Sequence, residues 1–283
     1  MTQRILIALT LLVLAGCPAP NDGPDNGDPT ESPDGGPVAV CLEGDSFIAD
    51  GDITLPEPEG PGDAHEITGL RAEAHDGCDR FVIDLATEDG DPASGAGDVE
   101  AEFLREMGVV RVTLRDVEMV HADATDASFD GPLAGAAYAV WAPEGRWTYV
   151  DLHLSDQAEA HVFVLQDPAR VVVDLRPGGG EIPEPATTTD SVVVLEPRPG
   201  DASYPLTVAG YSRLFEANTV VRLEQNGQEV SSDFTTATAW ADAWGHYSLT
   251  ISDGPTGPVT IHVGEHSARD GTWSGAEIQL NMQ

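Results

Sequence analysis

Histidines are the first residues of this chain whose spacing suggests chemistry. His262 and His266 lie four residues apart with Glu265 before the second, a set of side chains that suits zinc. On a β-strand, residues four apart share a face but lie about 13 Å from one another, too far to hold one ion. We therefore expect no metal site at this pair unless the chain turns between the two histidines.

Carboxylates are so abundant that neighbouring pairs arise by chance, since the chain has 49 acidic residues. Asp84 and Asp174 each precede a leucine in an otherwise apolar segment. We expect them to be buried and hydrogen bonded, or paired with arginine on a sheet face, rather than to act in acid–base catalysis. The acidic residues of segment 89–100 suit weak calcium binding, but a solvated acidic loop is the simpler interpretation.

Three aromatic residues, Trp141, Trp147 and Tyr149, flank a Pro-Glu-Gly turn. They are candidate ligand-binding residues, because exposed aromatic rings can stack on sugar rings. The alternative is that they pack in the core or across a hairpin.

Motifs of the common enzyme classes are absent from the sequence. There is no Gly-x-Ser-x-Gly elbow, no His-Glu-x-x-His and no phosphate-binding glycine loop. We therefore expect a protein that is not an enzyme and that needs no cofactor and no metal.

The N-terminus predicts export. Arg4 precedes an apolar run, 5–14, that is too short to span a bilayer, and small residues follow it. The sequence Leu-Ala-Gly-Cys that ends at Cys17 resembles the lipobox of bacterial lipoproteins. The resemblance implies diacylation of Cys17, cleavage before it, and anchoring to the outer face of the cell membrane. The alternative is an ordinary secretory signal with an incidental cysteine.

The other two cysteines, Cys41 and Cys78, form an even pair in an exported chain, so we expect a disulfide between them. Two separate buried thiols are the alternative. A disulfide across this loop would stabilise the fold by roughly 3–4 kcal/mol in the chain-entropy model.

The net charge of −36 argues against two classes of partner. All 13 basic residues are arginine, and there is no lysine. Such a chain repels nucleic acid and anionic lipid, so we expect no nucleic-acid partner. Screening of the carboxylates in salt suits a saline exterior, although codon bias also removes lysine.

Period-two alternation of apolar residues predicts an all-β chain of two β-sandwich domains behind a signal peptide and a disordered linker. The predicted parts are a signal peptide (1–16), an acidic Pro/Gly-rich linker (17–39), a β domain (40–179), a second linker (180–190) and an immunoglobulin-like domain (191–283). Strands are predicted at 80–85, 110–114, 147–154, 162–165, 171–175, 192–195, 206–209, 219–223, 247–251, 259–263 and 278–280. Only 98–107 has a pattern compatible with a helix.

The second domain carries a family resemblance. The segments 192–197, 208–217, 244–249 and 267–271 resemble, in order, the immunoglobulin-like domain of bacterial spore-germination proteins. The resemblance implies a non-catalytic extracellular module without transferable ligand residues. Phe215 and Trp244 are expected in its core.

The first domain resembles the AMIN-like domain of exported bacterial lipoproteins. The resemblance rests on segment 75–85 near its start and segment 167–175 at its end, two strands with an Arg-apolar-Asp-Leu pattern. Cys78 departs from the aromatic residue expected there. The resemblance implies a role in the cell envelope, since AMIN modules are associated with peptidoglycan.

These observations predict a lipid-anchored surface protein that binds cell-wall polymer or an envelope protein through two β-sandwich modules. Anchoring would raise its effective concentration near the wall. The alternative is an accessory protein that recruits or regulates a separate cell-wall hydrolase.

Overall fold

β-Strands form nearly all of the described chain, which confirms the predicted all-β fold class. The computed structural model describes residues 41, 46–56, 60, 62–142, 147–184 and 186–283. The strands are β1 (Gly51–Ile53), β2 (Glu66–His75), β3 (Cys78–Ala86), β4 (Val99–Leu104), β5 (Val109–Leu114), β6 (Met119–Val120), β7 (Asp126–Ser128), β8 (Ala134–Trp141), β9 (Thr148–Leu154), β10 (Ala158–Leu165), β11 (Arg170–Pro177), β12 (Thr187–Thr188), β13 (Val192–Glu196), β14 (Gly200–Ala202), β15 (Leu206–Ser212), β16 (Asn218–Gln225), β17 (Gln228–Thr236), β18 (Trp244–Ile251), β19 (Gly257–His266) and β20 (Trp273–Met282).

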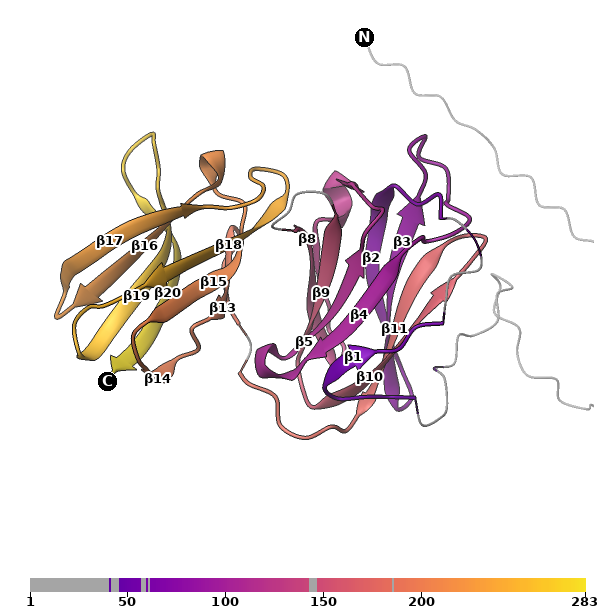
Figure 1. The fold of residues 1–283 in the computed structure, drawn as a ribbon, viewed down its shortest axis with the longest axis horizontal. Coiled ribbons are helices and arrows are strands. Elements are labelled where there is room, and N and C mark those ends of the chain that lie inside the picture. Colours follow the sequence, from indigo (N-terminus) through magenta and orange to yellow (C-terminus); the bar gives the residue numbers. More distant parts are fainter. Residues whose placement is uncertain (1–40, 42–45, 57–59, 61, 143–146, 185) are drawn as a thin grey trace, which may run out of the picture. The chain divides into compact units, whose positions relative to one another are not determined.

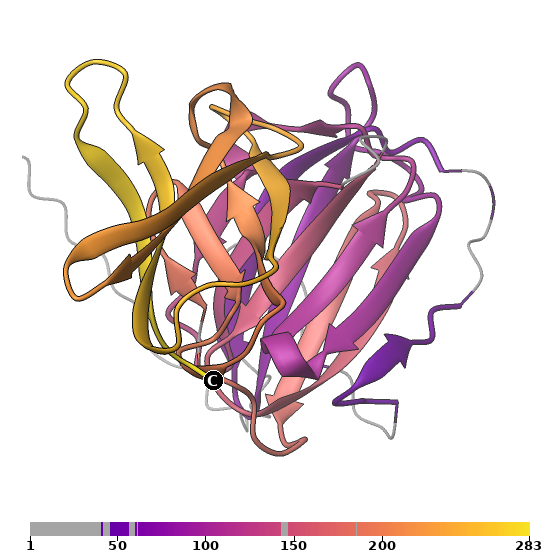
Figure 2. The ribbon, with the colours of Figure 1, turned by 60° about the vertical axis from the view of Figure 1, so that its left-hand side comes forward.

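These strands form three sheets (Figure 1, Figure 2). Sheet I has the order β1-β4-β5-β9-β8-β18-β15-β13-β12, with β7 also paired to β8. Sheet II has the order β10-β11-β3-β2-β6, and sheet III has the order β14-β20-β19-β16-β17. We call β1–β11 the first module and β13–β20 the second module. Sheet I belongs to both, because β8 pairs in parallel with β18 at Val140–Trp244 and Trp141–Gly245.

Each module has its own hydrophobic core. In the first module, apolar residues of sheet I face those of sheet II, and its largest fully buried side chains include Phe81 and Phe103. In the second module, residues such as Val208 and Tyr247 face Ile261 across the sandwich. Residues 40–283 form one compact unit. A third apolar cluster contains residues of both modules, Tyr149 and Tyr211 among them.

All eleven predicted strand segments are strands in the structure. The helical interpretation of 98–107 is wrong for most of its length, because Val99–Leu104 pairs with β5 as a strand and only Arg105–Met107 forms a 3-10 turn. The Asn226-Gly227 pair forms the hairpin turn between β16 and β17, where glycine supplies a φ of 77°.

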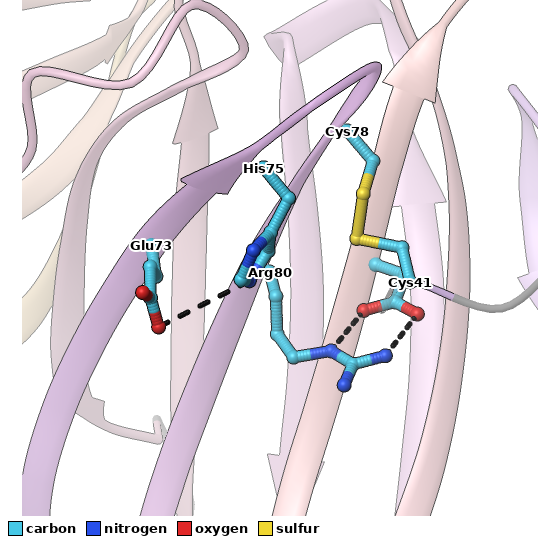
Figure 3. Close-up of a disulfide and its surroundings, with 6 residues drawn as sticks. Cys41, Glu73, His75, Cys78 and Arg80 are labelled. Atoms are coloured by element: carbon cyan, nitrogen blue, oxygen red, sulfur yellow. Dashed lines mark hydrogen bonds and ion pairs between the residues drawn. A yellow bond between two sulfur atoms is a disulfide. The ribbon is translucent and has the colours of Figure 1, made fainter. Parts of the chain in front are cut away.

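The predicted disulfide between Cys41 and Cys78 is confirmed, with a Cα–Cα distance of 6.5 Å (Figure 3). Cys78 begins β3, so the bond ties the segment before β1 to sheet II. Arg80 lies beside it and donates two hydrogen bonds to Asp174, with nitrogen–oxygen distances of 2.7 and 2.8 Å. The disulfide therefore fixes the start of the strand that carries this ion pair.

Residues 1–40, which contain the predicted signal peptide, the predicted lipidation site at Cys17 and all of the predicted first linker, lie outside the described residues. In the part of the chain that is described, no helix has the length and apolar character needed to cross a membrane.

Candidate functional site

Two arginines, one on β5 and one directly after it, organise the outer face of sheet I. Arg111 and Arg115 are four residues apart along the chain and project to the same face. The Arg111 guanidinium carbon lies 4.2 Å from the centre of the Tyr149 ring, and that of Arg115 lies 4.9 Å from the centre of the Trp147 ring. At these distances a cation is attracted to the electron-rich face of an aromatic ring.

A carboxylate holds each of these arginines in place. Asp151 accepts two hydrogen bonds from Arg111, both at 2.7 Å, and Glu100 accepts two from Arg115, at 2.9 and 2.6 Å. We call an arginine that lies over an aromatic ring and pairs with a carboxylate an arginine clamp. Two-point pairing of this kind fixes the plane of the guanidinium, so each guanidinium group stays close to coplanar with the carboxylate that it contacts.

The arginine clamp recurs through the described chain. Four further examples are Arg80 over Phe163 with Asp174, Arg176 over Phe47 with Glu159, Arg213 over Trp244 with Asp126, and Arg222 over Trp273 with Glu229. Six of the 11 arginines among the described residues therefore cover aromatic rings. In a chain without lysine, arginine is the side chain that can both stack and form a two-point ion pair.

The clamp around Asp151 lies where the two modules meet. Asp151 is fully buried, and Tyr211 of the second module also donates a hydrogen bond to it. Burial alone would lower the pKa of Arg111, but the charge of Asp151 and the hydrogen bonds to it raise that pKa well above its ordinary value. Burial, followed by the charge of Asp151, raises the pKa of Tyr149. The arginine therefore stays charged and the phenol neutral at physiological pH.

Beside these clamps a groove of about 570 Å³ opens along β1, β4 and β5. This volume falls within the range of small-ligand sites. Carboxylates, hydroxyls and one guanidinium alternate with short apolar side chains along its wall, which is formed by Asp52, Ile53, Thr54, Leu55, Val99, Glu100, Ala101, Glu102, Arg111 and Thr113. Because Arg111 is already paired with Asp151, the groove is acidic and rich in hydrogen-bond acceptors.

The three aromatic candidates occupy different environments at this place. Tyr149 is 4% exposed and belongs to the apolar cluster shared by the modules, so its ring has no free face. Trp147 is half-buried beneath Arg115, and Trp141 is half-buried at the end of β8, where its carbonyl accepts a hydrogen bond from Thr238 at 2.6 Å. These positions favour the packing interpretation for Tyr149. Trp141 lies opposite Thr148 in the β8–β9 register, so it is on the other face of the sheet from Tyr149.

A second carboxylate, Asp126, joins the two modules. It accepts hydrogen bonds at 3.0 Å from the indole N–H of Trp244 and from Arg213. Together with the Tyr211–Asp151 contact, these bonds explain why every residue of β9 is buried. The second module covers the face of β9 that the sequence alternation would leave to solvent.

The carboxylates predicted to be structural behave as expected. Asp174 is fully buried and pairs with Arg80, while Asp84 pairs with Arg71 at 2.7 Å and with Arg170 at 3.0 Å. Both lie on the outer face of sheet II. Arginine thus neutralises each of them, as in an ion pair on a sheet face.

The histidine pair lies on one strand, β19. His262 lies between Glu224 and Glu277, at nitrogen–oxygen distances of 3.4 and 3.2 Å, whereas His266 contacts Trp273 at the end of the strand. Among the described residues, no group of three or more His, Cys, Asp or Glu side chains is placed so that it could hold a metal ion. Within the acidic segment 89–100, Glu100 is paired with Arg115, and that hydrogen bonding lowers its pKa.

The position of Phe215 differs from the one expected from the sequence. It is 56% exposed instead of lying in the core, whereas Trp244 is 1% exposed, as expected. Phe215 heads a tight turn in which Glu216 and Ala217 have φ values of 55° and 59°, and this turn directs the ring outward. The apolar neighbour Leu214 takes the buried position instead.

Sequence reasoning also missed the roles of Arg111 and Arg115. Arg111 on β5 and Arg115 directly after it alternate with buried valine and leucine, a signal that places them together on the outer face. Their aromatic partners come from a strand more than thirty residues away, and nothing in the local sequence identifies that pairing.

Comparison with known proteins identifies one part of the chain. Residues 191–272 match the family described as the immunoglobulin-like domain of bacterial spore germination (Gmad2). No curated protein and no solved structure matches the chain. The second module therefore contains an immunoglobulin-like domain of the spore-germination type.

Proposed function

We propose that this chain is a lipid-anchored, non-catalytic protein of the cell surface that binds cell-wall polymer through the groove of the first module. The groove on β1, β4 and β5 is the observation that carries the proposal. Its wall offers several hydrogen-bond acceptors and more polar than apolar surface, which suits a ligand rich in hydroxyl and amide groups. Its acidic wall and the net charge of −36 disfavour a polyanion.

The immunoglobulin-like domain supports a binding role, because it is a non-enzymatic type of fold. Resemblance of residues 40–179 to an AMIN-like domain points in the same direction and stays a prediction. The ligand we favour is therefore the neutral glycan part of the wall, or an envelope complex that carries it.

Co-sedimentation with purified wall sacculi tests the groove. Glu102 is exposed on β4 and lines the groove, whereas Glu73 is exposed on β2 of sheet II. Glu102→Ala should weaken binding roughly tenfold, the effect of losing one hydrogen bond to a charged group. Glu73→Ala makes the same change in charge elsewhere and should bind as the parent does. Equal binding by all three proteins, or no binding of the parent at moderate and high salt, would overturn the proposal.

Lipid anchoring needs its own experiment, because Cys17 lies outside the described residues. Mass spectrometry of the mature protein should find an acylated Cys17 at the N-terminus, and Cys17→Ala should release the protein from the membrane. An unmodified N-terminus on a freely diffusing protein would contradict the anchor.

A second candidate function is recruitment of a cell-wall hydrolase. The edge strand β17 favours it, because eight of its nine residues are exposed, including Val230 at 48% and Phe234 at 63%. Long exposed edges can accept a strand from a partner. Crosslinking in the native envelope tests this function, and Ser232→Pro on β17 should abolish a hydrolase adduct that forms there.

A further inference from the structure

Phe215 and Trp240 form an exposed aromatic pair at one end of the second module. Their side chains are 56% and 49% exposed, and their ring centres lie 5.7 Å apart at an interplanar angle of 89°. Large apolar side chains normally reach such exposure singly, so two rings in contact on the surface are unusual. No described arginine lies over either ring, in contrast to the six arginine clamps.

The backbone around both rings is held in an uncommon conformation. Only five non-glycine residues of the described chain have positive φ, and three of them directly follow these aromatics: Glu216 (55°), Ala217 (59°) and Ala241 (61°). A left-handed conformation is costly for residues with a Cβ and tends to persist at functional sites.

Hydrogen bonds and close packing fix the two loops. The Phe215 N–H donates to Glu265 at 3.1 Å, and Ala237 donates to the carbonyl of Ala217 at 2.8 Å. The loop that carries Trp240 lies directly on β18. A Cβ added to Gly245 would come within 2.1 Å of the Ala239 nitrogen. The rings are therefore presented from a preorganised backbone, which reduces the entropy lost on binding.

We propose that Phe215 and Trp240 form a stacking site for a sugar ring of a neutral polysaccharide, separate from the groove of the first module. The proposal takes its ligand class from the proposed function but depends on different residues. A pyranose ring has an apolar face of C–H groups that matches an aromatic face, and its hydroxyls need acceptors around it. The carboxylates of Glu216 and Asp242 are exposed within two residues of the rings and supply such acceptors.

The same carboxylates argue against a lipid surface as the occupant. Insertion of the rings into a bilayer would bring these carboxylates to the headgroups, where they repel anionic lipid and lose hydration. The chain has no lysine to offset this charge.

Titration of the full mature chain with tetra-N-acetylglucosamine, a neutral soluble oligosaccharide, tests the site. Replacing both rings, Phe215→Ala with Trp240→Ala, should weaken binding at least roughly tenfold, as expected for aromatic residues that dominate an interface. Phe234→Ala is the matched control, since this ring is 63% exposed on β17 and is not part of the contacting pair. Trp240→Phe should keep most of the affinity but lose the fluorescence change on binding, which separates contact from a structural role.

Three results would overturn the inference: no binding of the oligosaccharide by the parent, unchanged affinity in the double variant, or an equal loss in Phe234→Ala. Binding of phosphatidylcholine vesicles through the two rings, without oligosaccharide binding, would also overturn it. Failure of this site and failure of the groove are distinguishable. If Glu102→Ala loses sacculus binding and the parent does not bind the tetrasaccharide, the groove is supported and the aromatic pair is not. If the parent binds the tetrasaccharide through the two rings and Glu102→Ala binds sacculi as the parent does, the aromatic pair is supported and the groove is not.

Discussion

Arginine covers aromatic rings in both modules, but not at the loop end of the second module. In the first module, Trp147 and Tyr149 lie beneath arginines whose guanidinium groups are paired with carboxylates, and in the second module Trp244 lies beneath Arg213. At the loop end of the second module, Phe215 and Trp240 have no such cover. The contrast shows that this chain has a general means of shielding a ring from water and that this pair of contacting rings lacks it. Two exposed rings in contact are therefore a candidate site for a ligand.

The largest expected effect on the free energy of unfolding distinguishes two tryptophans that are four residues apart. Trp244 is 1% exposed under Arg213, and Trp240 is 49% exposed. Trp244→Ala should lower the free energy of unfolding by about 3–5 kcal/mol, the usual cost of emptying a large core site. Trp240→Ala should lower it by less than about 1 kcal/mol. Urea unfolding measures both, and a similar loss in the two variants would remove the distinction between clamped and bare rings.

The next largest loss of stability is expected when the arginine clamp around Asp151 is broken. Asp151→Asn leaves Arg111 and Tyr211 without the charge that both contact, at a site where Asp151 is fully buried. We expect a loss of about 3 kcal/mol in the free energy of unfolding, because removal of one partner strands a charge that is largely shielded from water. A free energy of unfolding equal to that of the parent would show that the clamp does not contribute to stability. The melting curve of the variant at several ionic strengths supplies a second readout.

The acid stability of the molecule should depend on His153, which lies under the second module. Burial lowers its pKa to about 4 from an ordinary value of 6.5, although the charge of Asp151 opposes the shift. As the pH falls below about 6.5 the unfolded chain takes up this proton first, so the native state loses about 3 kcal/mol of stability by pH 4.

Unfolding of the parent and of His153→Gln at about pH 7 and about pH 4.5 measures this contribution. The variant should lose less stability than the parent across that interval. Equal losses would mean that His153 does not titrate during unfolding in this range.

The smallest effect is expected at the exposed clamp. The side chains of Arg115 and Glu100 are 37% and 55% exposed, and pairs of this kind contribute little to stability. Glu100→Gln should change the free energy of unfolding by less than about 1 kcal/mol. Quenching of tryptophan fluorescence by iodide should increase, because Arg115 is freed to move away from the Trp147 ring.

The sequence was sufficient for strands whose two faces differ. Segments such as β5 and β16 alternate apolar and polar residues and were located correctly. Strand β17 was missed because it is an edge strand with both faces largely in solvent, so no alternation marks it. Strand β8 was missed because its many alanines carry little strand propensity. Edge position and close packing are properties of the whole sheet, and local patterns do not contain them.

The candidate sites were less accessible to sequence reasoning than the strands. The aromatic residues of segment 141–149 were found, but their arginine cover depends on pairing between β5 and β9. Phe215 was expected in the core because it is a large aromatic residue, and the left-handed turn that directs it outward contains no glycine that would indicate such a turn. The disulfide was predictable because only two cysteines remained to form it.

Burial of β9 on both faces limits the exchange of its amide hydrogens with solvent. This strand pairs with β5 on one side and β8 on the other, and all seven of its residues are buried. Its amide hydrogens therefore have no local route to solvent and should exchange only when the whole native state unfolds. In a hydrogen–deuterium exchange experiment β9 should be the slowest segment and the exposed edge β17 among the fastest, so that a single strand reports the global opening rate.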